Sequence, residues 1–95
     1  MHVISRKVLI GFWNRHPDNK GALARWFKIM ERTGFSNFND LRTAFPTVDK
    51  VDNLIVFDIG GNKYRLIASI HSNRAKVYVR HVLTHREYDY GAWKS

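Results

Sequence analysis

Cysteine is absent from the 95-residue chain, and proline occurs only twice. Neither a disulfide nor a thiolate metal site can therefore hold the fold together. A chain without cysteine fits a reducing compartment, and we expect the protein in the cytoplasm. A long apolar run is also missing, because the N-terminal stretch MHVISRKVLIGFWNRH carries Arg6 and Lys7 and its apolar part is too short for a signal peptide or a membrane span.

Acidic side chains are scarce: eight Asp and Glu stand against sixteen Lys and Arg, which gives a net charge of +8. The imbalance is uneven, since residues 1–34 and 63–95 each hold seven basic and two acidic side chains, whereas 35–62 hold two basic and four acidic. This distribution favours a localised basic surface for a polyanionic partner, such as nucleic acid, an acidic protein or an anionic membrane. Simple solubility is the alternative explanation.

Two amphipathic helices are predicted in the first third of the chain. After a short opening strand, Ser5 is a candidate N-cap for a helix that ends before Pro17, because the residue preceding a proline avoids the helical region. Asp18 or Asn19 would cap a second helix, and Gly34 is its expected stop. The side chains expected in the core are Val8, Leu9, Phe12, Trp13, Leu23, Trp26, Phe27 and Met30.

The second half of the chain changes to the two-residue alternation of β-strands. LIVFDI (54–59), KYRLIASIH (63–71) and AKVYVRHVL (75–83) are predicted strands, joined by turns at 60–62 and 72–73. One helical turn is expected at DLRTAF, before the first of them. The chain is thus predicted to be a single α+β domain over residues 1–95, with an N-terminal helical hairpin packed on a small antiparallel sheet and a short C-terminal helix.

Strict alternation gives the two faces of this sheet different chemistry. It places His81 with the core residues, so we interpret this histidine as structural. The residues predicted to share the opposite face are Lys63, Arg65, Lys76, Tyr78 and Arg80. Arginine can hold a phosphate through two parallel hydrogen bonds and tyrosine can stack on a base, so this face is a candidate RNA-binding surface. A solvated outer face is the alternative.

The segment VRHVLTHREYDYGAW contains a predicted helix start. Thr84 and Glu87 have the spacing of a capping box, in which each side chain accepts a hydrogen bond from the other residue's backbone N–H. Leu83 and Tyr88 have the spacing of a hydrophobic staple across the same start. The capping box therefore accounts for the presence of Thr84 and Glu87 without a functional role, and the staple partly accounts for the presence of Tyr88.

His85 and Arg86 are not explained by capping. A cation in the first helical turn is locally unfavourable, which suggests a functional purpose. Asp89 lies four residues after His85, where its carboxylate can orient the imidazole for proton transfer near neutral pH. A plain surface histidine is the alternative. Five histidines without a cysteine make a metal site unlikely, and neither a P-loop nor a nucleophile elbow is present, so no cofactor is expected.

Two stretches, AFPTVDKVDNLIVFDIGGNKYRL and VYVRHVLTHREYDY, resemble the HigB-type toxins of bacterial toxin–antitoxin systems, within the RelE-like superfamily. The resemblance is most specific over residues 44–90; before them it is limited to MHVIS and an approximate helical pattern. It implies a compact RelE-like α+β fold and an mRNA interferase activity on translated message. It also implies a cognate helix-turn-helix antitoxin, HigA-like, as the partner.

The resemblance also implies site residues. The Y-R-L step of the family places Arg65 at the scissile phosphate, and THREYDY offers His85, Tyr88 and Tyr90 for the leaving group and the base. The expected catalytic residues are Arg65, Arg80, His85, Tyr88 and Lys63. The expected RNA contacts are Lys76, Tyr78, Arg86 and Arg74.

The hypothetical mechanism is metal-free RNA cleavage on the ribosome. The ribose 2′-OH attacks the adjacent phosphorus and expels the 5′ oxygen, leaving a cyclic phosphate. His85 serves as general acid, or else as base, and the base is alternatively a Lys or Tyr of lowered pKa. Two other functions fit the same basic face: a non-catalytic RNA- or DNA-binding module, and an antitoxin-type interaction protein that binds an acidic partner.

Overall fold

The computed structural model describes residues 1–4, 6–61 and 63–94. The predicted cap at Ser5 and the Asn62 position of the predicted turn lie outside the described residues. The elements in chain order are β1 (His2–Ile4), α1 (Arg6–Arg15), α2 (Lys20–Arg32), α3 (Phe38–Ala44), β2 (Asp49–Val51), β3 (Leu54–Ile59), β4 (Tyr64–His71), β5 (Lys76–Thr84) and α4 (His85–Tyr90). Short 3-10 turns occupy Pro17–Asn19, Ser72–Arg74 and Ala92–Lys94.

The sheet has five strands in the order β1-β5-β4-β3-β2. Strands β2 to β5 pair antiparallel as a meander, but β1 pairs parallel with β5. The α+β class and the antiparallel meander are therefore confirmed, and the parallel strand β1, which was not expected in the sheet, makes it a mixed sheet. The alternation pattern missed this because β1 and β2 each have only three residues, too few to show a periodic pattern.

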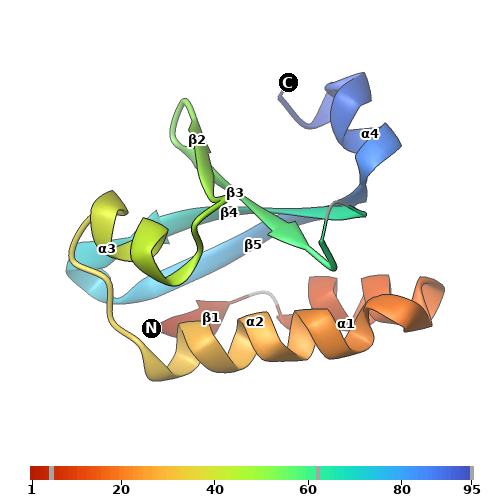
Figure 1. Cartoon of the computed structure of the whole chain (residues 1–95). Helices are drawn as coiled ribbons and strands as arrows, with labels where there is room; N and C mark the ends of the chain where they lie inside the picture. Colours follow the sequence, from red (N-terminus) through yellow and green to blue (C-terminus); the bar gives the residue numbers. More distant parts are fainter. Residues whose placement is uncertain (5, 62, 95) are drawn as a thin grey trace.

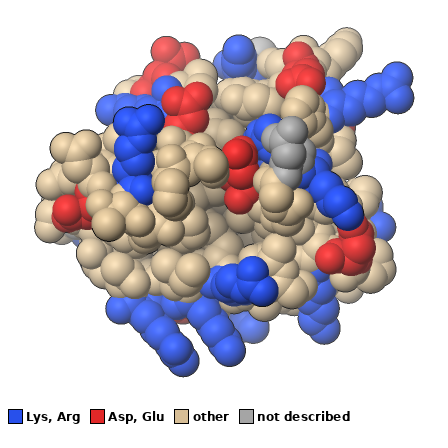
Figure 2. All heavy atoms as spheres, in the orientation of Figure 1, with Lys and Arg blue, Asp and Glu red and all other residues tan. Residues whose placement is uncertain are grey.

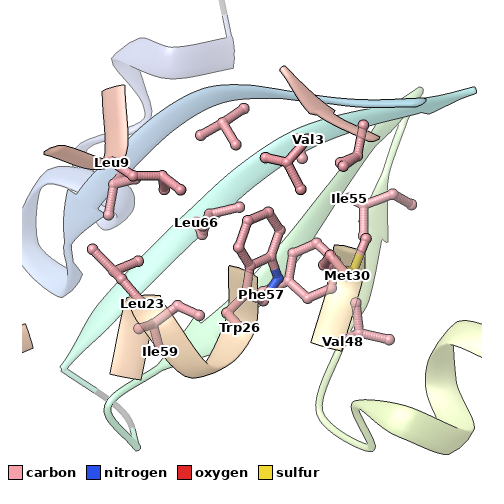
Figure 3. Packing of buried hydrophobic residues seen from close by; sticks show 14 of the residues in the cluster. Val3, Leu9, Leu23, Trp26, Met30, Val48, Ile55, Phe57, Ile59 and Leu66 are labelled. Carbon is pink, nitrogen blue, oxygen red and sulfur yellow. The ribbon is translucent and has the colours of Figure 1, made fainter. Parts of the chain in front are cut away.

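Helices α1 and α2 both lie against one face of the sheet (Figure 1). Their buried side chains meet those of the strands in the main core, where Trp26 packs edge-on against Phe57 at 5.4 Å between ring centroids, close to Leu66 and Met30 (Figure 3). The amphipathic stripes of the two helices thus explain why this face is covered. Among the described residues, no helix is long and apolar enough to cross a membrane.

The boundaries of α2 differ from the predicted ones. Asn19 holds the N-cap position, but its side chain makes no capping hydrogen bond and is only 1% exposed. Asp18 does not cap either, because both its carboxylate oxygens accept hydrogen bonds from the Tyr64 hydroxyl, at 2.9 and 3.1 Å. The helix ends at Arg32, with an extended Thr33 after it, two residues before the predicted stop at Gly34.

A second, smaller cluster lies on the other face of the sheet, where Val56, Ile67 and Trp93 are buried together. Helices α3 and α4 lie at opposite ends of β4 and β5, with α4 and the C-terminal segment above this outer face (Figure 1). Strand β2 stands on the same side of the sheet as α4. The outer face is therefore partly covered and is not a uniformly solvated surface.

A β-bulge in β5 changes which side chains point outward. Ile67 pairs with His81 and the next residue, Ala68, pairs with Val79, so Arg80 is the extra residue. The alternation reverses after it: Val82 belongs to the main core, whereas His81 is exposed on the outer face. The prediction that His81 is a core histidine is therefore wrong, because one inserted residue moves every later side chain to the opposite face.

Candidate active site

Arg65 lies in β4 on the outer face and is only 9% exposed. Its cross-strand partner in β3 is Asp58, and the Arg65 Nε lies 3.1 Å from the Asp58 carboxylate. One terminal nitrogen, Nη1, donates to the backbone carbonyl of Tyr64 at 3.2 Å. A buried guanidinium is stable only when it is paired and hydrogen-bonded, so the register of β3 and β4 fixes this arginine in one orientation.

An aromatic stack covers the arginine. The Arg65 guanidinium carbon lies 5.5 Å from the centre of the Tyr88 ring, within the range of a cation–π contact. On its other side Tyr88 is stacked on Trp93, with centroids 5.1 Å apart and the rings within 14° of parallel. The indole N–H of Trp93 donates to the Tyr88 carbonyl at 3.0 Å. Trp93, which is 7% exposed, thus anchors Tyr88 above Arg65.

The environment of Tyr88 raises the pKa of its phenol above the ordinary value near 10. Burial is the largest cause, followed by the negative charges of Asp49 and Asp58, while the positive charge of Arg65 opposes them. A raised pKa keeps the hydroxyl protonated at neutral pH, so Tyr88 is a hydrogen-bond donor there. The upward shift of the pKa argues against the hypothesis that this tyrosine is a base of lowered pKa.

His85 follows directly after β5 and lies at the end of the sheet that carries Arg65. Leu83 lies directly opposite Arg65, and two residues later the backbone N–H of His85 donates to the Lys63 carbonyl at 3.0 Å. The predicted His85–Asp89 contact is confirmed, with Nδ1 2.8 Å from the carboxylate, and the imidazole remains 44% exposed. Holding Nδ1 in this way leaves Nε2 as the nitrogen that can exchange a proton with a ligand.

The start of α4 is fixed as the sequence indicates. The capping box is confirmed: the Thr84 hydroxyl accepts from the Glu87 N–H at 3.2 Å, and the Glu87 carboxylate accepts from the Thr84 N–H at 2.9 Å. Gly91 ends the helix in the left-handed conformation, with φ of 83°. Because both ends of this six-residue helix are capped, the positions of His85, Tyr88 and Asp89 relative to one another are well defined.

The other predicted site residues do not join this group. The Nε of Arg80 donates to the Ser69 hydroxyl at 3.2 Å, and Ser69 lies on the same face of β4 as Arg65 but four residues away, about 13 Å along the strand. Lys76 pairs with His71, farther still, and Tyr78 makes an edge-on ring contact with the same histidine. Arg74 lies in the turn at that far end, and Arg86 lines a groove together with His81, Tyr90 and Trp93.

Charge is also less localised than the sequence suggests. Figure 2 shows Lys and Arg side chains below the sheet as well as above it, with acidic groups between some of them. Sequence reasoning missed Asp58, Asp49 and Trp93, the three residues that enclose Arg65 and Tyr88. An acidic residue inside the apolar strand LIVFDI was the available signal for Asp58, whereas nothing local indicated Trp93.

Within the part of the chain that the structure describes, no group of three or more His, Cys, Asp or Glu side chains is placed to hold a metal ion. His81 and His85 are four residues apart, but His81 belongs to β5 and His85 begins α4, so the two do not share one helical face. The described site therefore consists of a paired arginine, an aromatic stack, a His–Asp pair and an exposed lysine.

Comparisons with known proteins show what the chain is similar to. The family model described as HigB_toxin, RelE-like toxic component of a toxin-antitoxin system, matches residues 19–91. An mRNA interferase HigB of Escherichia coli O6:H1 is 34% identical over 92 residues, which cover 94% of this chain and 89% of the relative. An mRNA interferase toxin HigB of Escherichia coli K12 and an mRNA interferase HigB of Shigella flexneri are each 32% identical over 93 residues, covering 95% of this chain and 89% of each relative.

Proposed function

Because the chain belongs to the HigB family of RelE-like toxins, we propose that it is the toxin of a toxin–antitoxin system and an endoribonuclease that cleaves mRNA. The observation that carries this proposal is the arrangement around Arg65: a guanidinium fixed by Asp58 lies under Tyr88, and the His85–Asp89 pair lies at the same end of β4 and β5. Phosphoryl transfer needs a cation at the phosphate and a proton donor at the leaving oxygen. Both are present at one end of β4 and β5.

The nucleophile comes from the substrate. The ribose 2′-OH attacks the adjacent phosphorus, its proton leaves to water, and the bond from phosphorus to the 5′ oxygen breaks as the 2′,3′-cyclic phosphate forms. The protein therefore has to stabilise charge and supply one proton. Arg65 stabilises the growing charge on the phosphoryl oxygens, and the exposed Lys63, whose carbonyl binds the His85 N–H, contacts the same group.

His85 is the proposed general acid. Its Nδ1 is bound to Asp89, which leaves Nε2 as the nitrogen that passes a proton to the departing 5′ oxygen. Tyr88 stays protonated because its pKa is raised, and it donates a hydrogen bond to a phosphoryl oxygen. The catalytic role expected of Arg80 has no support from its position at Ser69.

The partners follow from the family. An antitoxin restrains the toxin, and we propose that it is a HigA-like helix-turn-helix protein. We further propose that message is cut during translation on the ribosome, hence in the cytoplasm, since the net charge of +8 suits a surface surrounded by RNA phosphates.

The decisive experiment maps new mRNA ends after incubation with translating ribosomes. We expect wild-type protein to produce cuts, and Arg65→Ala to lower the cleavage rate by about 100-fold or more, as for loss of one donor to a developing oxyanion. His85→Ala should lower the rate by about 100-fold as well, as for loss of a general acid. Arg25→Ala, an equal change of charge at an exposed position of α2, is the control.

Retained binding of the co-expressed antitoxin would show that each variant is folded. If Arg65→Ala and His85→Ala both cut message and arrest growth like the wild type at matched expression, the site is wrong. If the wild type binds RNA with a steep salt dependence but makes no new ends, the protein is a non-catalytic binding module.

A further inference from the structure

The far end of the sheet holds a hollow that the catalytic proposal does not use. It has a volume of about 510 Å³ and lies between α3 and the ends of β4 and β5. The β3–β4 pairing stops at Ile55 and Ala68, so the last three residues of β4, Ser69 to His71, extend beyond β3 and border the hollow. Figure 1 shows α3 at this end of the strands and α4 at the opposite one.

Three basic or titratable side chains from three different strands line this hollow: Lys50 of β2, His71 of β4 and Arg80 of β5. Among the described residues, no Asp or Glu lines it, and neither Lys50 nor Arg80 forms an ion pair with a described carboxylate. Like charges drawn together without a counter-ion repel one another. A bound anion would remove that repulsion.

The position of Arg80 is fixed, because the Ser69 hydroxyl accepts a hydrogen bond from its Nε at 3.2 Å. The β-bulge produces this placement, since Arg80 is the unpaired residue of β5. A guanidinium anchored through Nε keeps its terminal nitrogens in a defined fork, the geometry that binds phosphate through two hydrogen bonds. The arginine is therefore positioned like a ligand-binding residue, away from the catalytic group.

Aromatic rings accompany these cations. Phe38, which is partly exposed, lines the hollow over the buried core residue Phe35, and His71, in the same lining, meets Tyr78 edge-on at 5.2 Å between centroids. Cations interleaved with rings are typical of grooves that hold single-stranded nucleic acid, since the rings receive bases and the cations receive phosphates. A carboxylate-bearing peptide would use the cations alone. The hollow therefore fits RNA better than an acidic protein segment.

We propose that this hollow is a second RNA subsite, in which Arg80, Lys50 and His71 bind a backbone phosphate remote from the one that is cleaved. The inference rests on the proposed nuclease function. Arg65 and Ser69 share one face of β4, about 13 Å apart, which a stacked strand covers in about four nucleotides. One strand of message thus runs along the sheet from the catalytic end to the α3 end.

The test measures how affinity depends on RNA length. The probes are two RNAs built around a cut mapped with the wild type, each with a 2′-deoxy sugar at the cut so that binding occurs without cleavage. The short one is the dinucleotide spanning the cut, and the long one extends about six nucleotides to each side, which exceeds the separation of the two subsites. We expect Arg80→Ala and Lys50→Ala each to weaken binding of the long RNA by about 10-fold, as for loss of one charge-assisted contact.

The dinucleotide should bind both variants like the wild type. For the long RNA, the slope of log affinity against log salt should fall by about 0.7 in the variant that lacks both side chains, as for the loss of one phosphate contact. Arg25→Ala, the same loss of charge on the opposite side of the sheet, should change either affinity by less than about 2-fold. Lys50 is exposed, so its variant remains informative even if Arg80→Ala disturbs the bulge.

If Arg80→Ala weakened the binding of the dinucleotide and of the long RNA equally, the inference would be overturned, because Arg80 would then contact the RNA at the cleaved phosphate. Unchanged RNA binding together with weakened antitoxin binding would also overturn it, by showing a protein-docking surface. In either case the wild type still cuts message, so the proposed function stands. A wild type that neither binds nor cuts RNA would refute the function itself.

Discussion

At the scale of single residues, the candidate site depends on how a buried arginine is held. Arg65 is paired with Asp58 through the β3–β4 register and lies under a ring that Trp93 supports. Sequence reasoning identified Arg65, His85 and Tyr88, since each lies in a motif with a local physical meaning. It missed Trp93, because the stacking of residues 88 and 93 depends on the turn at Gly91, which brings the end of the chain back over the sheet.

Trp93→Ala tests this support. Removal of the indole exposes Val56 and Ile67 and leaves Tyr88 without its stacked partner, so we expect the free energy of unfolding to fall by about 3 kcal/mol. The cleavage rate of the folded fraction should fall as well, because Tyr88 is no longer fixed above Arg65. Urea unfolding measures the first effect. Tyr90→Ala, an aromatic truncation at the end of α4 where the side chain is 85% exposed, should cost less than about 0.5 kcal/mol.

At the scale of secondary-structure elements, the bulge in β5 decides the character of both sheet faces. Strict alternation correctly assigned Val77 and Val79 to the core and Arg80 to the outer face, but it failed from His81 onward. A bulge of this kind needs no glycine, so the sequence VYVRHVL gave no sign of it. Its consequence is that His81 turns to the outer face and Val82 to the main core.

A pair of adjacent substitutions distinguishes the observed register from strict alternation. Val82 is 5% exposed and packs in the main core, whereas His81 is exposed. We therefore expect Val82→Ala to lower the free energy of unfolding by about 1–3 kcal/mol, and His81→Ala to change it by less than about 0.5 kcal/mol. Thermal denaturation of both variants at neutral pH is the measurement. If His81→Ala were the more destabilising of the two substitutions, the strand would follow strict alternation and would contain no bulge.

At the scale of the whole molecule, the connection between the helical layer and the sheet runs through Tyr64. Its hydroxyl donates to both carboxylate oxygens of Asp18, and its ring meets Phe12 edge-on at 5.3 Å. This contact joins the link between α1 and α2 to the residue that precedes Arg65. The helical layer is thereby tied to the end of β4 that carries the candidate site.

The same contact predicts an alkaline loss of stability. The pKa of Tyr64 is raised above the ordinary value near 10, chiefly by the hydrogen bond to Asp18 and then by burial. A raised folded-state pKa means that the folded protein keeps its proton while the unfolded chain releases it, so stability is complete below pH 10 and falls as pH rises through the folded pKa. Burial of Tyr88 acts in the same direction.

Tyr64→Phe should therefore lower the free energy of unfolding by about 1 kcal/mol at pH 7, since one hydrogen bond to a charged group is lost. Above pH 10 the difference from the wild type should shrink, because the variant has no phenol to ionise at this position. Urea unfolding at a series of pH values follows both effects. A constant difference across the range would show that Tyr64 does not titrate as its contacts indicate.

The sequence by itself determined the α+β class, the apolar stripes of α1 and α2, the capping box at Thr84 and the His85–Asp89 pair. Each of these depends on residues at most a few positions apart, whose spacing fixes their geometry. Only the tertiary structure decided the parallel β1–β5 pairing, the outward turn of His81, the Asp58–Arg65 ion pair and the Tyr88–Trp93 stack. These depend on strand register and on chain reversals, which are set by packing across the sheet and leave no periodic trace in the local sequence.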